Sequence, residues 1–193
     1  IWRFGDGTVG SKTVEVIDQV SNPYTSALVC GGDEDAWVSF VRGLWGRTTI
    51  LRFSIAVNFT SLLLRFLSHR PFIVHLWGPS GVGKTAMAKL AASAFGDPEA
   101  LSSTLNRTQV SVTECFAHLD DFILLYDELQ VSTIDRSQLI YAFCGGKGRG
   151  RAMREGGVRR EPTWSTILRT TGEEPLLGAA GRRDLGGQAN RVL

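Results

Sequence analysis

Residues 78–85 have the types and the spacing of a phosphate-binding loop. They read G-P-S-G-V-G-K-T and match the pattern G-x-x-x-x-G-K-[ST] at every fixed position. Glycines allow the positive backbone φ angles that turn amide N–H groups toward a phosphate, and a following helix points the positive end of its dipole at the same anion. The sequence therefore predicts a nucleoside triphosphate site. The residues expected to contact the nucleotide are Gly78, Pro79, Ser80, Gly81, Val82, Gly83, Lys84 and Thr85.

The last two residues of this loop carry the side chains with direct chemical roles. Lys84 is placed to pair with the β and γ phosphates, and the hydroxyl of Thr85 is placed to bind Mg²⁺. ATP and Mg²⁺ are therefore the expected cofactors. Ser80 is not expected to be a hydrolase nucleophile, because the G-x-S-x-G pattern needs glycine at the position of Val82.

Two acids end the apolar run F-I-L-L-Y-D-E at residues 122–128. At the tip of a buried strand, the carboxylate of Asp127 can hold Mg²⁺, and the adjacent Glu128 can polarise an attacking water. The distance along the chain from Lys84 to Asp127, 43 residues, leaves room for a helix, a strand and a second helix. Acid pairs also cap helices, so the assignment depends on the phosphate loop upstream.

Positive charge is concentrated between positions 147 and 160, where six cations face a single acid, Glu155. The pair Gly156-Gly157 in the middle indicates a β-hairpin. Because the whole chain has a net charge of only +2, a basic site must be local. We expect contacts to DNA phosphates from Lys147, Arg149, Arg151 and Arg154. A solvated loop, or arginines that serve a neighbouring subunit's nucleotide, would give the same pattern.

Two further candidates lie near the C-terminus. Thr171 follows the strand-like run W-S-T-I-L-R-T at residues 164–170, where a polar side chain would lie close to the γ phosphate and the attacking water. Thr170 is the next choice for this role. Arg191 is a candidate arginine finger supplied to the next subunit, with an ordinary surface arginine as the equal alternative.

The elements that must position these residues follow from the pattern of apolar residues. Short apolar runs bounded by turn signals predict buried strands, and helical spacing predicts the segments between them. Strands are expected at residues 72–77, 101–105, 122–128 and 164–170, and helices at residues 85–95, 108–119 and 132–144.

Upstream of the phosphate loop, two helices are expected. Asp33 is a plausible cap for a helix at residues 34–45, and Arg70-Pro71 would end a second helix at residues 48–68. The apolar residues expected to pack in the core are Trp37, Phe40, Val41, Leu44 and Trp45 in the first helix, and Phe53, Val57, Leu62, Leu63 and Phe66 in the second. Strands are also expected at residues 1–4, 13–20 and 191–193, and such abrupt ends suggest a piece of a longer protein.

Size and composition fit one globular domain with a full core. The chain has 193 residues, of which 43% are apolar and 21% charged. Three cysteines, Cys30, Cys115 and Cys144, form no C-x-x-C pair, which favours reduced thiols in a cytoplasmic protein over a zinc site. No apolar run reaches about 18 residues and no signal peptide is evident, so a membrane partner is not expected.

These observations predict an α/β fold, a P-loop NTPase with a central parallel sheet flanked by helices, an N-terminal helical part and a basic β-hairpin insertion. The expected division has an N-terminal extension, or part of a preceding domain, at residues 1–32. A helical lead-in follows at residues 33–71, and the ATPase core occupies residues 72–193.

The chain from about residue 33 to residue 193 resembles the domain-of-unknown-function family numbered 927. The resemblance is carried by H-L-W-G-P-S-G-V-G-K-T, L-A-A-S-A-F-G-D-P-E, I-L-L-Y-D-E-L, G-G-K-G-R-G-R-A-M-R-E-G-G and R-T-T-G-E-E. That family consists of helicase-like P-loop ATPases of phages, plasmids and other mobile elements.

The resemblance implies an AAA-like ATPase ring similar to helicases of the superfamily III and minichromosome-maintenance type. In such rings a hairpin just before the sensor strand enters the central channel and grips DNA, and residues 147–160 occupy that place. The family's terminal G-x-x-x-R-V segment is matched approximately at residues 187–192, which contain Arg191. Thr171 stands where related ATPases have a sensor asparagine.

The leading hypothesis is an ATP-driven DNA helicase or translocase of a mobile-element replication protein, which hydrolyses ATP between the subunits of a homo-oligomeric ring. A helicase loader or other protein-remodelling ATPase would share the nucleotide site but use the hairpin on a protein. A non-motor switch would bind ATP with negligible turnover. A small-molecule kinase is less well supported, because Asp127 and Glu128 suit activation of water.

Overall fold

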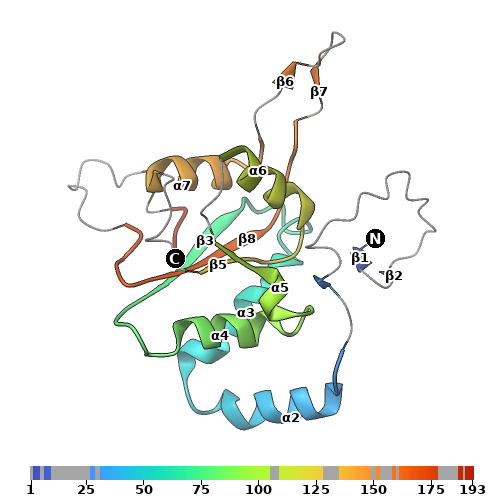
Figure 1. Ribbon diagram of the computed structural model, residues 1–193, viewed down its shortest axis with the longest axis vertical. Helices are drawn as coiled ribbons and strands as arrows, with labels where there is room; N and C mark the ends of the chain where they lie inside the picture. The colour runs from blue at the N-terminus through green and yellow to red at the C-terminus, as the bar shows by residue number, and fades with distance from the viewer. Residues whose placement is uncertain are drawn as a thin grey trace.

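The computed structural model describes residues 2–4, 7–9, 27–28, 31–104, 109–127, 135–148, 151–152, 158–159, 161–177, 187–188 and 190–193. Its centre is a four-stranded parallel sheet in the order β3-β8-β5-β4 (Figure 1). The strands are β3 (Phe72–Trp77), β4 (Ser102–Thr104), β5 (Leu124–Asp127) and β8 (Ile167–Gly172). Because β8 lies between β3 and β5, the last strand in the chain is central to the sheet.

Helices cover both faces of this sheet. Figure 1 shows α2, α3 and α4 on one side, and α6 and α7 on the other. The helices are α2 (Glu34–Trp45), α3 (Thr49–Ser61), α4 (Lys84–Ala92), α5 (Pro98–Leu101), α6 (Gln109–His118) and α7 (Arg136–Cys144). The predicted α/β class, with a parallel sheet flanked by helices, is confirmed.

The central position of β8 explains the burial of its residues. A buried strand was expected at residues 164–170, whereas β8 begins at Ile167, and all six of its residues are buried. A parallel strand with helices on both faces has no solvent side. Even Arg169, in the middle of β8, is only 1% exposed.

The buried guanidinium of Arg169 fastens α3 to the sheet. Its Nη1 donates hydrogen bonds to the carbonyl oxygen of Ser54, at 3.0 Å, and to Oδ1 of Asn58, at 3.2 Å. Its Nη2 donates to the hydroxyl of Ser54 at 2.6 Å. Burial lowers the pKa of Arg169 to about 10. Ser54 and Asn58 lie four residues apart on one side of α3. Both can be buried because they bind the cationic side chain of Arg169.

The two helices before β3, α2 and α3, differ from the prediction in burial. Asp33 caps α2 as expected, because its Oδ1 accepts a hydrogen bond from the amide of Ala36 at 3.0 Å. However, α3 ends at Ser61 and turns follow to residue 68. Val41 and Val57 are buried and Trp37, Leu44 and Leu62 are partly buried, but Phe40, Trp45, Phe53, Leu63 and Phe66 are exposed.

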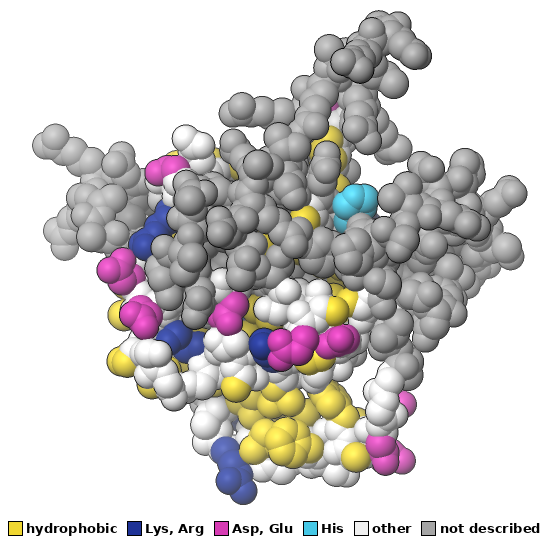
Figure 2. All heavy atoms as spheres, in the orientation of Figure 1, with side chains coloured by type: hydrophobic (Ala, Val, Ile, Leu, Met, Phe, Trp, Pro, Cys, Tyr) yellow, Lys and Arg dark blue, Asp and Glu magenta, His cyan; other side chains and the backbone are white. Residues whose placement is uncertain are grey.

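These side chains are exposed because neighbouring elements cover only part of this apolar segment. The buried residues are Val41 in α2 and Leu51, Ser54, Ile55, Val57, Asn58 and Ser61 in α3. Figure 2 shows hydrophobic side chains at the surface of the lower part of the molecule, where α2, α3 and α4 lie.

An aromatic cluster fills the core between the sheet and the helices α6 and α7. The ring of Phe116 is 1% exposed and lies 4.9 Å from Phe143, 5.3 Å from Trp164 and 6.4 Å from Tyr126, measured between ring centroids. The indole Nε1 of Trp164 donates to the carbonyl oxygen of Phe143 at 2.8 Å. These contacts join α6, β5, α7 and the segment that leads into β8.

Elements in the second half of the chain follow the prediction with shifted bounds. The strand predicted at residues 101–105 is β4, shortened because the Asp97 cap and Pro98 start α5 just before it. The helix predicted at residues 108–119 is confirmed as α6, and α7 begins at Arg136 behind an Asp135 cap. Residues 132–134 and the strand predicted at residues 13–20 lie outside the described part of the chain.

Two small antiparallel pairs stand apart from the central sheet. The strands β1 (Trp2–Phe4) and β2 (Gly7–Val9) pair near the N-terminus. The strands β6 (Arg151–Ala152) and β7 (Val158–Arg159) form the predicted basic hairpin, which projects from the body of the molecule (Figure 1). An antiparallel bridge between Lys147 and Thr163 joins the two chain segments at its base.

The described residues give no sign of a structural metal or a membrane span. Among them no helix has both the length and the apolar character needed to cross a bilayer, and no cluster of three His, Cys, Asp or Glu side chains is placed to hold a metal ion. Cys115 and Cys144 are both buried. Burial raises the pKa of Cys144 to about 12, so its thiol stays protonated near neutral pH.

Candidate functional site

The loop at residues 78–83 joins the end of β3 to the start of α4. Gly78, Gly81 and Gly83 have φ angles of +148°, +80° and +86°. A Cβ atom added at any of them would meet no atom within 4 Å beyond the adjacent residues, so the backbone conformation and not crowding requires glycine. Gly83 is the N-cap of α4 and supplies no side-chain cap. The first amides of α4 therefore receive no hydrogen bond from an N-cap side chain.

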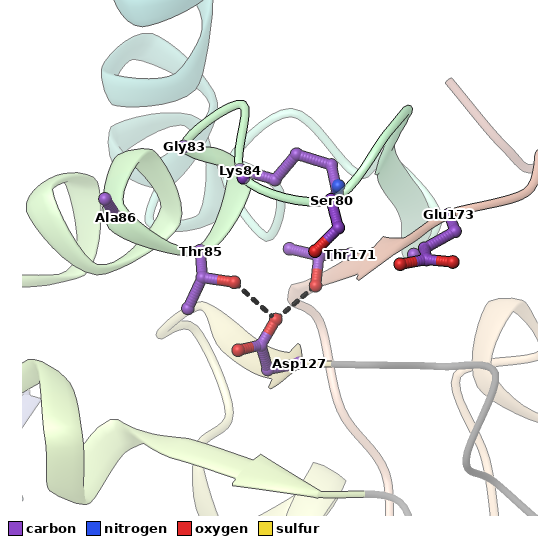
Figure 3. Close-up of a pocket in the computed structure, with 10 residues that line it drawn as sticks. Ser80, Gly83, Lys84, Thr85, Ala86, Asp127, Thr171 and Glu173 are labelled. Carbon is purple, nitrogen blue, oxygen red and sulfur yellow. Dashed lines mark hydrogen bonds between the residues drawn. The ribbon is translucent and has the colours of Figure 1, made fainter.

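Three side chains from separate elements meet at the carboxyl edge of the sheet. Thr85, in the first turn of α4, donates a hydrogen bond from its hydroxyl to Oδ1 of Asp127 at 3.0 Å. Thr171, near the end of β8, donates to the same carboxylate oxygen (Figure 3). The carboxyl ends of parallel strands lie at one edge, and β8 is the neighbour of β5, so this meeting follows from the sheet order.

A cavity of about 260 Å³ opens beside these three residues. In Figure 3, Lys84 and Ser80 lie across from Asp127, and Glu173 lies past Thr171 on the side away from Thr85. The residues that line it are Ser80, Gly81, Gly83, Lys84, Thr85, Ala86, Asp127, Thr171, Gly172 and Glu173. Gly78, Pro79 and Val82 belong to the same loop but lie outside this lining. The structure thus gathers most of the predicted loop residues with Asp127 and Thr171 around one cavity.

Lys84 folds back over its own loop. Its Nζ donates hydrogen bonds to the carbonyl oxygens of Gly78, at 2.8 Å, and Pro79, at 2.7 Å. Both acceptors of this ammonium are neutral carbonyl oxygens. A phosphate that entered would offer a stronger, charged acceptor.

Thr171 and Thr170, the two candidates for a polar group near the γ phosphate, point to different sides of β8. Thr171 lines the cavity, whereas Thr170 is fully buried and contacts Nδ1 of His75 at 2.7 Å. Successive side chains of a strand point to opposite faces, which explains the division. Glu173 is a cavity residue that sequence reasoning missed, although its place directly after the T-T-G run was a usable signal.

Arg191 lies away from the cavity of its own chain. Its carbonyl oxygen accepts a hydrogen bond from the amide of Ile73, near the start of β3, whereas the loop follows the end of that strand. The guanidinium carbon lies 4.8 Å from the ring centroid of Tyr141, and Nη1 donates to the carbonyl oxygen of Gly187. Arg191 therefore does not contribute to the cavity beside Asp127, and its role stays a prediction.

Several predicted site residues cannot be placed in this geometry. Glu128, Arg149 and Arg154 lie outside the described residues, and the structure describes only the backbone of Arg151. Lys147 is exposed at the base of the hairpin. Their roles in hydrolysis and in DNA binding stay predictions.

Comparison with known proteins identifies a family and a similar fold. The model of a domain of unknown function, DUF927, matches residues 3–164. No curated protein matches the chain. A solved structure described as the active helicase Cch of SCCmec type IV is similar, with a TM-score of 0.69 and 20% sequence identity over 95% of this chain. The chain spans 34% of the length of that structure, and at this identity the likeness concerns the fold.

Proposed function

The chain belongs to the DUF927 family, and on this premise we propose that it is the ATPase part of a DNA helicase or translocase of a mobile-element replication protein. Within this proposal residues 72–193 form a P-loop, AAA-like core, residues 33–71 a helical lead-in and residues 1–32 an extension. The finer fold assignment is supported by the glycine loop between β3 and α4 and by the position of β8 between the loop strand and the acid strand.

One observation supports this proposal most strongly: the hydroxyls of Thr85 and Thr171 both donate to Asp127 beside the loop that carries Lys84. A hydroxyl and a carboxylate 3.0 Å apart are hard oxygen ligands of the kind that Mg²⁺ prefers. Thr85 and Asp127 would therefore hold Mg²⁺, which would neutralise charge on the phosphates during hydrolysis. The loop amides and Lys84 would hold the phosphates, and Glu128 would orient the attacking water.

Two features support action on DNA in an assembly of subunits. The basic hairpin projects from the body of the molecule, where a strand of nucleic acid could reach it (Figure 1). Arg191 contacts the start of β3, whereas the glycine loop of the same chain follows the end of that strand. A finger role would therefore require the nucleotide site of a neighbouring subunit. We therefore propose that ATP is hydrolysed between subunits and that hydrolysis moves the hairpin.

The test is phosphate release from Mg·ATP, with and without single-stranded DNA, over a range of protein concentrations. Turnover is expected to rise with protein concentration as subunits complete each other's sites, and to rise several-fold with DNA. Replacing Arg149 and Arg151 with glutamine is expected to remove the stimulation by DNA. Turnover indifferent to nucleic acid would favour a helicase loader, and tight ATP binding without phosphate release would favour a switch.

Salt dependence gives a separate measure of the hairpin. Six cations lie between residues 147 and 160. If all six met phosphates, log K for duplex DNA would fall against log salt with a slope of roughly −5, and less steeply for single strands. A titration of fluorescent DNA at several salt concentrations measures this slope. A slope close to zero would contradict the assignment of the hairpin to DNA.

A further inference from the structure

His75 is a buried histidine whose two ring nitrogens contact both ends of one short segment. It lies on β3 in register with Thr170 of β8, and it is 8% exposed. Its Nδ1 lies 2.7 Å from the hydroxyl of Thr170, and its Nε2 lies 2.8 Å from the carbonyl oxygen of Glu174. A carbonyl only accepts, so Nε2 carries a hydrogen and donates to Glu174.

The charge state of the ring follows from its surroundings. Burial lowers the pKa of His75, and the positive charge of Arg136 lowers it further, whereas the hydrogen bond to Glu174 raises it. Arg136 itself lies 3.4 Å from the carboxylate of Glu174. In the neutral ring with its hydrogen on Nε2, Nδ1 accepts from the hydroxyl of Thr170.

The three residues between these two contacts form one side of the cavity, and we call residues 171–173 the cavity wall. Thr171 in this wall donates to Asp127, and the carbonyl oxygen of Gly172 accepts from the amide of Gly78 at 3.3 Å. His75 thus contacts the two residues that flank the wall, Thr170 and Glu174. The wall itself contacts β5 through Thr171 and the glycine loop through Gly172.

We propose that His75 is a positioning residue that fixes the cavity wall, and through it the hydroxyl of Thr171 against Asp127. The effect on hydrolysis rests on the proposed function. In the proposed function the hydroxyl of Thr171 lies near the γ phosphate during hydrolysis. A displacement of such a group by about 1 Å can lower the rate of reaction by about 100-fold. The phosphate loop and Lys84, which would bind ATP and ADP alike, make no contact with the ring of His75 in the hydrogen bonds of the described residues.

Substitutions can remove the two contacts one at a time. The oxygen of His75→Asn can replace Nδ1 as the acceptor for Thr170, and the amide nitrogen of His75→Gln can replace Nε2 as the donor to Glu174. Thr170→Val removes the first contact from the other strand with little change in volume, and Thr170→Ser keeps the hydroxyl. Val74→Ala is the control for a general loss of packing in β3. Val74 is the buried residue next to His75, and its side chain packs in an apolar cluster with Val57, Leu64, Ile123 and Ile167.

Two measurements separate a positioning role from a purely structural one. We expect Thr170→Val and both His75 variants to lower kcat by about 10- to 100-fold while the Kd for ADP changes by less than about twofold. Thr170→Ser should restore kcat. Hydrogen exchange of the amides at residues 171–174, measured without nucleotide, should be faster in Thr170→Val and both His75 variants and unchanged in Val74→Ala.

The proposal is overturned if these variants lose thermal stability to the same extent as Val74→Ala and keep both kcat and the exchange rates of the wall. It is also overturned if Thr170→Val behaves like Thr170→Ser. Failure of the proposed function has a different signature, in which the unaltered chain binds no nucleotide. Even then, the exchange measurement decides whether His75 holds the wall.

Discussion

Replacing Asp127 with asparagine is expected to lower ATP hydrolysis by about 100-fold or more. The amide oxygen of asparagine can still accept the hydrogen bonds that Thr85 and Thr171 donate to Oδ1, so the local geometry should remain. The negative charge that attracts Mg²⁺ is lost. Phosphate release measured as a function of Mg²⁺ concentration should therefore show a lower maximum and a higher Mg²⁺ requirement.

Two other variants show whether the effect is specific to this carboxylate. Glu99→Gln removes the same charge from an exposed carboxylate that pairs with Lys89, and turnover should change by less than about twofold. Glu128→Gln should abolish turnover while ATP still binds, because the expected role of Glu128 concerns the water and not the metal. Turnover in Asp127→Asn within about threefold of the original chain would contradict the proposed site.

Phe116→Ala is expected to destabilise the fold by about 3–5 kcal/mol. The ring of Phe116 is 1% exposed and lies within 6.4 Å of three other aromatic rings, which belong to Phe143, Trp164 and Tyr126. Its removal would leave a large cavity where α6, α7 and the sheet meet, and the edge-to-face ring contacts would be lost as well. Unfolding in urea, followed by tryptophan fluorescence, measures the difference in the free energy of unfolding.

An exposed phenylalanine provides the control for this measurement. Phe40 is 57% exposed, so Phe40→Ala should change the free energy of unfolding by no more than about 0.5 kcal/mol. A cost below about 1 kcal/mol for Phe116→Ala would mean that the core between α6 and α7 is packed differently from the structure.

The parts of the site that were predictable from the sequence are those governed by local rules. The glycines at positions 78, 81 and 83 adopt positive φ angles, and α4 begins directly after them. Such backbone angles depend on residue type and not on distant partners. The contact between Asp127 and Thr85 followed from the order of the elements along the chain. Asp127 ends β5, and Thr85 lies in the first turn of the helix after β3, so both lie at the edge where the parallel strands end.

The parts that could not be predicted depend on partners far away in the sequence. His75 and Arg169 stand in short apolar runs, and their partners Thr170 and Ser54 are 95 and 115 residues away. An apolar run shows that a strand is buried but not which polar side chains will meet inside the core. The exposure of Phe40 and Phe53 has a related cause, because helical periodicity cannot show which side of an apolar helix packs against a neighbour.

The backbone at the C-terminal residues has a consequence for how adjacent sites could communicate. Ile73 exchanges hydrogen bonds with Arg191 and Leu193, and the amide of His75 donates to Leu193, so this end of the chain is tied to β3 along its free edge. If the side chain of Arg191 reached a neighbour in the proposed ring, a pull on that side chain would act on β3, the strand that leads into the glycine loop of its own chain. Successive ATPase sites would then be linked mechanically through a single strand.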